Sequence, residues 1–173
     1  MLRAISPERR CYIIGNGRSR LNYQLDQIPY TTFGCNQLYR DFQPTYLLAQ
    51  DRNVLECMTR DGYTGEVWVP LTRYRQHQGA YQRMRAIPGS STDTWLTGEW
   101  CIILAAQLGF NRMDLIGFDG GPDSHYRPRT DTNQSLERCQ THRTRYQHSF
   151  QRLQQRYPKI LIKTDQYFMQ AYK

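Results

Sequence analysis

Short apolar runs that each stop at a glycine, asparagine or aspartate constrain the fold of this chain most strongly. The runs cover residues 11–14, 31–34, 46–49 and 113–118, and the polar residues that follow them are Gly15-Asn16-Gly17, Asn36, Asp51 and Asp119. Strands buried on both faces of a parallel sheet are continuously apolar, whereas half-exposed strands alternate. We therefore expect parallel strands here, and two further ones over residues 67–69 and 160–162.

Helical spacing between these runs indicates crossover connections. After Thr97-Gly98, the positions Trp100, Ile103, Leu104 and Leu108 follow a helical period that Gly109 ends. A short helix is expected after Gly17, and a long amphipathic helix over residues 134–157, ended by Pro158. Residues 71–91 have no clean period and are predicted to be irregular.

This order of elements predicts an α/β, Rossmann-like fold, with a mostly parallel sheet and helices on both faces. The 173 residues fit a single nucleotide-binding domain, residues 1–173, since the chain contains neither a repeat nor a linker. Five well-separated cysteines without a C-x-x-C pair favour reduced thiols and a cytoplasmic location. The sequence contains neither an evident signal peptide nor an apolar stretch long enough to span a membrane.

The carboxyl ends of parallel strands meet at one rim, where ligands bind in such sheets. Gly15-Asn16-Gly17 would let backbone N–H groups approach an oxyanion, and Ser19 would cap the next helix; an ordinary tight turn is the alternative. Thr97 and Gly98 would hold phosphate or ribose, or form a simple N-cap. Asp51, at the end of the third run, is also expected to contact the nucleotide at this rim. It begins an incomplete Asp-x-Asp motif, from which no metal is inferred.

Candidate catalytic groups follow the run at 113–118. Asp119 is a possible base, ribose ligand or cation ligand, or else a turn-stabilising residue. His125 is a candidate general base, Tyr126 could donate a hydrogen bond to a leaving phosphate, and Arg129 could stabilise that phosphate. The alternative is that these are exposed loop residues without a catalytic role. No metal cluster is predicted, and no cofactor is expected.

The motifs over residues 11–126, taken in order, resemble two related families. Ile14-Gly15-Asn16-Gly17-Arg18-Ser19, Cys35-Asn36, Thr97-Gly98 and Gly117-Phe118-Asp119 are similar to motifs of bacterial lipooligosaccharide sialyltransferases, and to those of 6-hydroxymethylpterin diphosphokinase-like and small phage proteins. The resemblance implies that Asn16, Asn36, Thr97 and Gly98 contact a cytidine nucleotide, and that a downstream histidine is the general base. Arg18 stands where these families have proline, and Leu96 where a hydroxyl residue is usual.

Three functions remain open from the sequence. The first is a metal-independent transferase that uses a nucleotide-activated donor, most simply a glycosyltransferase. The second is a diphosphokinase-like enzyme, which would need magnesium held by carboxylates such as Asp51 and Asp119. The third is a nucleotide- or nucleic-acid-binding protein without catalysis, which the net charge of +8 and the many arginines would suit. If the acceptor of the transferase is a nucleic acid, the protein would combine the first function with the nucleic-acid binding of the third.

Overall fold

A single parallel sheet organises the computed structural model, which describes residues 7–90, 95–120, 144–146 and 148–168. In that part of the chain the sheet has seven strands in the order β5-β4-β3-β2-β1-β6-β7, and every neighbouring pair is parallel. The strands are β1 (Arg10–Ile14), β2 (Thr31–Cys35), β3 (Tyr46–Leu48), β4 (Val67–Pro70), β5 (Met84–Ile87), β6 (Arg112–Ile116) and β7 (Leu161–Thr164).

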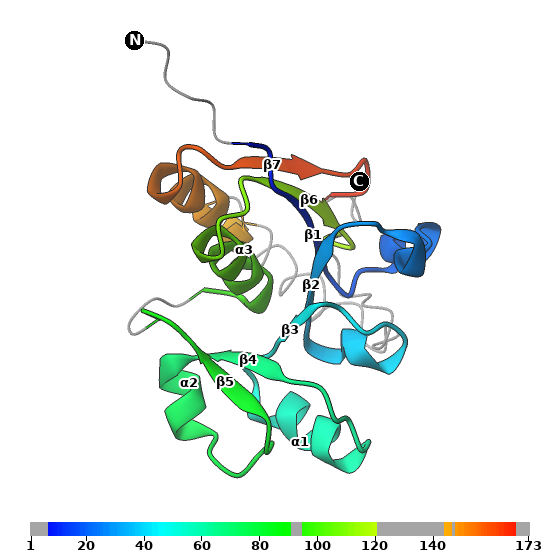
Figure 1. The fold of residues 1–173 in the computed structure, drawn as a ribbon, viewed down its shortest axis with the longest axis vertical. Coiled ribbons are helices and arrows are strands. Elements are labelled where there is room, and N and C mark those ends of the chain that lie inside the picture. Colours follow the sequence, from blue (N-terminus) through cyan, green and yellow to red (C-terminus); the bar gives the residue numbers. More distant parts are fainter. Residues whose placement is uncertain (1–6, 91–94, 121–143, 147, 169–173) are drawn as a thin grey trace.

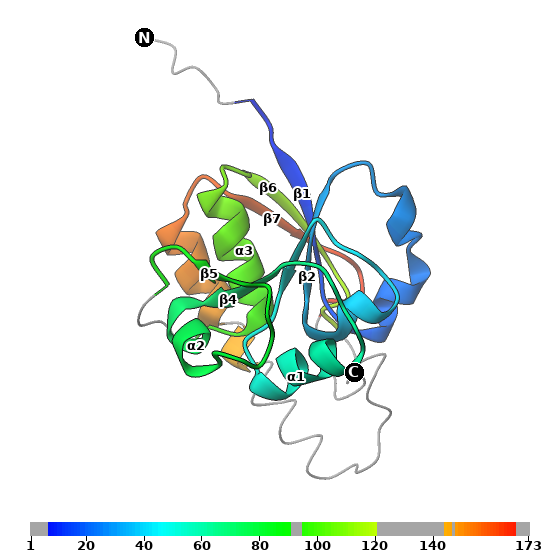
Figure 2. The same cartoon turned by 60° about the horizontal axis from the view of Figure 1, so that its bottom comes forward.

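Helices cover both faces of this sheet (Figures 1 and 2). One face carries α3 (Thr97–Gln107) and the C-terminal helical segment, residues 144–146 and 148–156. The other carries α1 (Arg52–Arg60), α2 (Leu71–Gln76) and three short 3₁₀ helices, η1 (Arg18–Asn22), η2 (Leu25–Gln27) and η3 (Asn36–Arg40). The predicted Rossmann-like α/β fold is confirmed.

The strand order reverses between β1 and β6. From β1 the chain builds outward through β2, β3, β4 and β5, whereas β6 and β7 are added on the other side of β1. Connections therefore leave β1 and β6 in opposite directions, which leaves a crevice beyond their carboxyl ends. The loops that start at Gly15 and Gly117 border this crevice.

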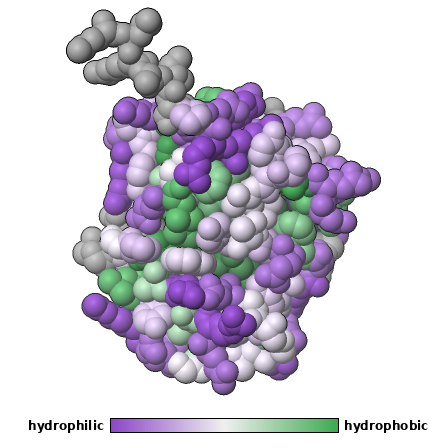
Figure 3. Space-filling model, in the orientation of Figure 1, coloured by the Kyte–Doolittle hydropathy of each residue, from purple (hydrophilic) through white to green (hydrophobic). Residues whose placement is uncertain are grey.

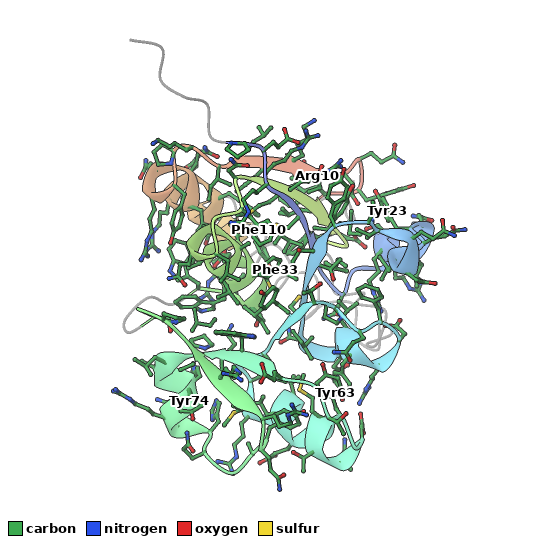
Figure 4. All side chains as sticks on the ribbon, viewed as in Figure 1. Arg10, Tyr23, Phe33, Tyr63, Tyr74 and Phe110 are labelled. Atoms are coloured by element: carbon green, nitrogen blue, oxygen red, sulfur yellow. The ribbon has the colours of Figure 1, made fainter. Side chains whose placement is uncertain are left out.

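Two apolar layers hold the sheet, one on each face. On the α3 side, Phe33 stacks on Tyr46 with ring centroids 4.8 Å apart and meets the edge of Phe110 at 5.6 Å. Figure 4 shows Phe33 and Phe110 side by side, and Figure 3 shows an apolar band across the middle of the same view. α3 is apolar on all sides, with nine buried residues from Thr97 to Ala105, because it fills the space between the sheet and the C-terminal helical segment.

Two local predictions were wrong. The segment predicted to be irregular, residues 71–91, contains α2 and β5 in its described part, residues 71–90. The six residues of α2 are too few to show a helical period, and β5 is a short edge strand with an exposed Arg85. The short helix expected after Gly17 is the pair of 3₁₀ helices η1 and η2. The predicted long helix is helical over 144–146 and 148–156, while its predicted first part, 134–143, lies outside the described residues.

The described helices include none long and apolar enough to cross a membrane.

Three of the described cysteines have buried thiols. Cys11 and Cys101 are fully buried and Cys35 is 6% exposed. The Cys35 thiol donates to the Ile14 carbonyl (3.5 Å) and the Cys101 thiol to the Gly34 carbonyl (3.7 Å). Burial raises the pKa of Cys11 to about 12 and also raises that of Cys101. Neutral, inaccessible thiols are poor nucleophiles.

A thiol titration tests this protection. In a Cys139→Ser background at pH 8, we expect an aromatic disulfide reagent to modify the half-buried Cys57 in the native protein and the other three cysteines only in denaturant. Rapid native reaction of a second thiol would contradict the burial described above.

Candidate functional site

The loop after β1 lies against the end of β6 without intervening side chains. The Gly15 N–H donates to the Ile116 carbonyl (2.9 Å) and the Gly17 N–H to the Gly117 carbonyl (2.8 Å), which extends the β1–β6 pairing. A Cβ at Gly15 would lie 2.3 Å from the Gly117 oxygen. Gly117 itself has φ +74°, in the left-handed region that glycine adopts without strain. Glycine is therefore required here for close backbone approach.

Asp119 anchors this loop. Its Oδ2 accepts from the Ser19 backbone N–H at 2.9 Å, and its Oδ1 accepts a short hydrogen bond from the Ser19 hydroxyl. A Cβ at Gly17 would lie 2.5 Å from the Asp119 carboxyl carbon, so glycine also lets the carboxylate approach. The expected capping role of Ser19 is thus replaced by a bond to Asp119; the residue before η1 is Gly17, which has no side chain to cap it.

Asn16 and Asn36 bring unsatisfied amide oxygens to neighbouring strand ends. The Asn16 Nδ2 donates to the Cys35 carbonyl (2.8 Å), which ties the first loop to the end of β2. Asn36 follows β2 with φ +54°, a conformation that asparagine tolerates. The Oδ1 atoms of both residues are buried without a hydrogen-bond partner in the described structure. Buried acceptors without a partner are uncommon in native proteins and fit a ligand that supplies donors.

An ion pair between a buried arginine and an exposed aspartate joins the same two loops at a second point. Arg20 in η1 is 1% exposed, and its guanidinium donates to both carboxylate oxygens of Asp41, just after η3, at 2.8 and 3.2 Å. Paired arginine–carboxylate contacts fix orientation as well as distance. The two asparagine-bearing loops are therefore held together by Arg20–Asp41 and by Asn16–Cys35.

The start of α3 is the next element at the rim. Thr97 is 6% exposed and Gly98 is buried. A Cβ at Gly98 would lie 2.5 Å from the Phe118 ring and 3.4 Å from the Tyr146 hydroxyl oxygen. Thr97 is the first residue of the helix rather than its cap, and the preceding residue is Leu96. No sequence pattern indicated that Tyr146, on the C-terminal helical segment, would reach this turn.

Glu99 lies fully buried in the first turn of α3. Its Oε2 accepts from the Leu96 N–H at 2.6 Å. Burial raises the pKa of Glu99, and the Ser149 hydroxyl, the Leu96 amide and the positive charges of Arg145 and Arg152 partly offset that effect. The Glu99 carboxylate therefore interacts both with the first turn of α3 and with the arginines of the C-terminal helical segment.

The raised pKa of Glu99 predicts a pH-dependent stability. The folded protein binds the Glu99 proton more tightly than the unfolded chain does. Protonated Glu99 therefore adds fully to the free energy of unfolding below its pKa in the unfolded chain, and this contribution is lost as the pH rises through its pKa in the folded protein. We expect Glu99→Gln, which keeps an oxygen for the Leu96 amide, to flatten the fall in unfolding free energy above about pH 4. Urea unfolding at several pH values measures this. Parallel pH profiles of the two proteins would contradict it.

Asp165 and Tyr23 add a polar group that the sequence analysis missed. Asp165 directly follows β7, and its Oδ2 accepts from the Tyr23 hydroxyl at 3.1 Å. Tyr23 lies between η1 and η2, close to the end of β7 (Figure 4). Burial, with a smaller contribution from the Asp119 carboxylate, raises the pKa of Asp165, and burial together with Asp165 raises that of Tyr23 to about 12. A polar residue at a strand end was the available signal, but the strand was predicted to end at Ile162.

Asp51 stands apart from this group. It follows β3, two strands from β1, and its side chain is exposed. Its backbone carbonyl accepts from Val54 and Leu55 at the start of α1, while its carboxylate makes no capping hydrogen bond. Within the described residues, the Asp51 carboxylate therefore forms no hydrogen bond or ion pair with the polar group around β1 and β6.

The other predicted catalytic residues, His125, Tyr126 and Arg129, lie outside the described residues. Within the described ranges, no group of three or more histidine, cysteine or acidic side chains is arranged to hold a metal ion.

Comparison with solved structures gives a consistent result for the fold. The sialyltransferase CstII from Campylobacter jejuni in complex with the substrate analogue CMP-3FNeuAc aligns with a TM-score of 0.54 and 13% identity, over 90% of this chain and 80% of that one. The sialyltransferase CST-II in complex with a trisaccharide acceptor and CMP aligns with a TM-score of 0.52 and 14% identity, over the same shares. This chain shares their fold.

The predicted sialyltransferase resemblance is thereby supported at the level of fold, and the diphosphokinase-like resemblance is not. No protein-family model matches the chain, and no curated protein sequence matches it significantly. The sialyltransferase-like fold therefore rests on three-dimensional arrangement, and any activity must be argued from the residues at the rim.

Proposed function

We propose that this protein is a glycosyltransferase-like transferase that binds a nucleotide-activated sugar at the rim formed by the loops after β1, β2 and β6. One observation carries the proposal: within the described part of the chain, the Oδ1 atoms of Asn16 and Asn36 are buried without a partner on the adjacent loops after β1 and β2, beside the β1–β6 pair where strand order reverses. Acceptor oxygens at this place suit the amino and hydroxyl donors of a nucleoside.

The polarity of the site fits a nucleotide with its phosphate near the first loop. Arg18 is exposed directly after Gly17, and α3 directs its first N–H groups toward the rim from Thr97-Gly98. The Tyr146 hydroxyl, whose pKa burial raises, stays protonated and can donate beside Gly98. CMP, which is bound in the aligned CST-II structure, is the first nucleotide to test.

The proposed reaction needs no metal ion. An acceptor hydroxyl oxygen bonds to the anomeric carbon of the sugar as the bond from that carbon to the phosphate oxygen breaks. We assign the hydroxyl proton to His125, and to Tyr126 and Arg129 the stabilisation of the negative charge with which the nucleotide leaves. Both carboxylate oxygens of Asp119 are engaged by Ser19, so we assign Asp119 to anchoring the loop and His125 to the base.

A ligand-induced thermal shift tests the nucleotide site, because a ligand that binds only the folded state raises the melting temperature. We expect CMP and CMP-sugars to raise it with or without EDTA. Asn16→Ala, Asn36→Ala and Tyr146→Phe should weaken this shift, and Asn53→Ala, an exposed asparagine in α1, should not. Release of CMP from a CMP-sugar then tests catalysis. A protein that responds to no nucleotide would overturn the proposal, and a shift lost in EDTA would overturn metal independence.

A basic surface supports a second candidate, nucleic-acid binding. Residues 71–90 contain four arginines and no acidic residue, and Arg73, Arg75, Arg83 and Arg85 are all exposed on α2, β5 and the segment between them. Phosphate contacts by such arginines would make affinity fall steeply with salt. We expect steep salt dependence of single-stranded DNA binding if this candidate holds, and an Arg73→Gln, Arg75→Gln variant should reduce it. The absence of any binding at low salt would remove it.

A further inference from the structure

A pocket lies beside the rim, between the C-terminal helical segment and β7. Its volume is about 560 Å³, within the range of small-molecule sites. Phe150, Ile162 and Phe168 form its apolar wall, and His148, Gln151, Gln154 and Thr164 supply its polar groups. We infer that this pocket is an acceptor subsite for a neutral saccharide, an inference that rests on the proposed glycosyltransferase function.

The charge of the pocket disfavours an anionic ligand. Although the chain carries a net charge of +8, none of the described residues that line the pocket is an arginine, a lysine or an acid. Lys163 lies between Ile162 and Thr164 on β7, so strand alternation directs it to the opposite face. Arg152, on the same helix, instead covers the Trp95 ring, with its guanidinium carbon 4.3 Å from the ring centroid. A phosphate or carboxylate would therefore find no counter-charge among these lining residues.

The free polar atoms match hydroxyl groups, each of which both donates and accepts. Gln154 donates through Nε2 to the Ile160 carbonyl (3.2 Å), which leaves its Oε1 as an acceptor. His148 uses Nδ1 on the Thr144 carbonyl (3.0 Å), which leaves Nε2 as an acceptor. Gln151 and Thr164 are exposed and offer both donors and acceptors.

The apolar wall suits the C–H face of a sugar ring and leads to the nucleotide site. Phe150 and Phe168 meet edge to face at 5.4 Å, and an aromatic face attracts the weakly positive C–H groups of a pyranose. Phe150 also stacks at 6.1 Å on Tyr146, whose hydroxyl lies beside Gly98. Phe150 and Tyr146 thus connect the wall of the pocket to the start of α3, which places a saccharide in the pocket next to the proposed nucleotide site.

Saccharide titrations of the intact chain test the inference, with lactose and maltotriose as neutral probes and glucose 6-phosphate as the anionic one. We expect saturation-transfer NMR signals from at least one neutral probe and none from the phosphate. Gln151→Leu and Thr164→Val should each weaken the dissociation constant of that probe about tenfold, since each removes a hydrogen-bonding group. Gln155→Leu, exposed on the same helix but outside the pocket, is the matched control.

The outcomes separate this inference from the function on which it rests. If CMP binds while neither neutral probe does, if the phosphate competes with them, or if Gln151→Leu and Gln155→Leu behave alike, the subsite is overturned and the nucleotide site stands. If a neutral probe binds with the expected mutational pattern while no nucleotide binds, the pocket is a saccharide site and the transferase proposal fails. Unchanged melting temperatures of the variants would show that altered binding is not caused by unfolding.

Discussion

Gly15→Ala is expected to lower the free energy of unfolding by about 3 kcal/mol and to abolish nucleotide binding. The new methyl group would lie 2.3 Å from the Gly117 carbonyl oxygen, and this neighbour is backbone that cannot rotate away. The loop would have to separate from β6 and lose the bond from the Gly15 N–H to the Ile116 carbonyl. Urea unfolding gives the stability, and CMP titration gives the binding.

Gly79→Ala serves as the control for this substitution. Gly79 has φ +83° but no described atom within 4 Å of the position that a Cβ would take, so alanine there costs about 1 kcal/mol from backbone strain alone. The difference between the two variants measures the clash at Gly15. Equal losses of stability, or a Gly15→Ala protein that binds CMP normally, would contradict the close contact between the two loops.

Asp119→Ala is expected to weaken CMP binding about hundredfold, because the Ser19 amide and hydroxyl both lose their charged acceptor. Ser19→Ala removes only the hydroxyl bond and should cost about tenfold. The double variant should bind no worse than Asp119→Ala, since the two side chains act as one unit. Isothermal titration of the three variants with CMP measures these differences.

Asp26→Ala, which removes an exposed carboxylate on η2, controls for the change in net charge. A carboxylate that merely repelled the nucleotide phosphate would give the opposite sign, so tighter CMP binding by Asp119→Ala would contradict the anchoring role. If Asp119→Ala instead left binding intact and abolished only turnover, Asp119 would be the catalytic base.

The fold was largely predictable because strands that are buried on both faces of a sheet consist of continuous runs of apolar residues. The runs at 11–14, 46–49 and 113–118 are apolar for most of their length, and each coincides with a strand of the sheet interior. β5 was missed because an edge strand is exposed along one side and tolerates Arg85. The six residues of α2 are too few to establish a helical period.

The candidate site was only partly predictable, for a different reason. Asn16, Asn36 and Asp119 could be grouped because each follows a strand, and parallel strands end at one rim. The Tyr23–Asp165 bond joins residues 142 positions apart, and no local pattern records such a pairing. Tyr146 lies on the apolar face of its helix, but its hydroxyl reaches Gly98 because glycine leaves room there.

The ties among the loops after β1, β2 and β6 have a dynamic consequence. Asn16–Cys35, Arg20–Asp41 and Ser19–Asp119 join these loops into one cooperative unit, so none can open without breaking a partly buried polar contact. Their backbone amides should exchange with deuterium at a common rate, and a ligand held by the first loop alone would slow exchange in all three. A ligand would then bind to a site that is already formed in the free protein, and the three loops would not close around it one after another.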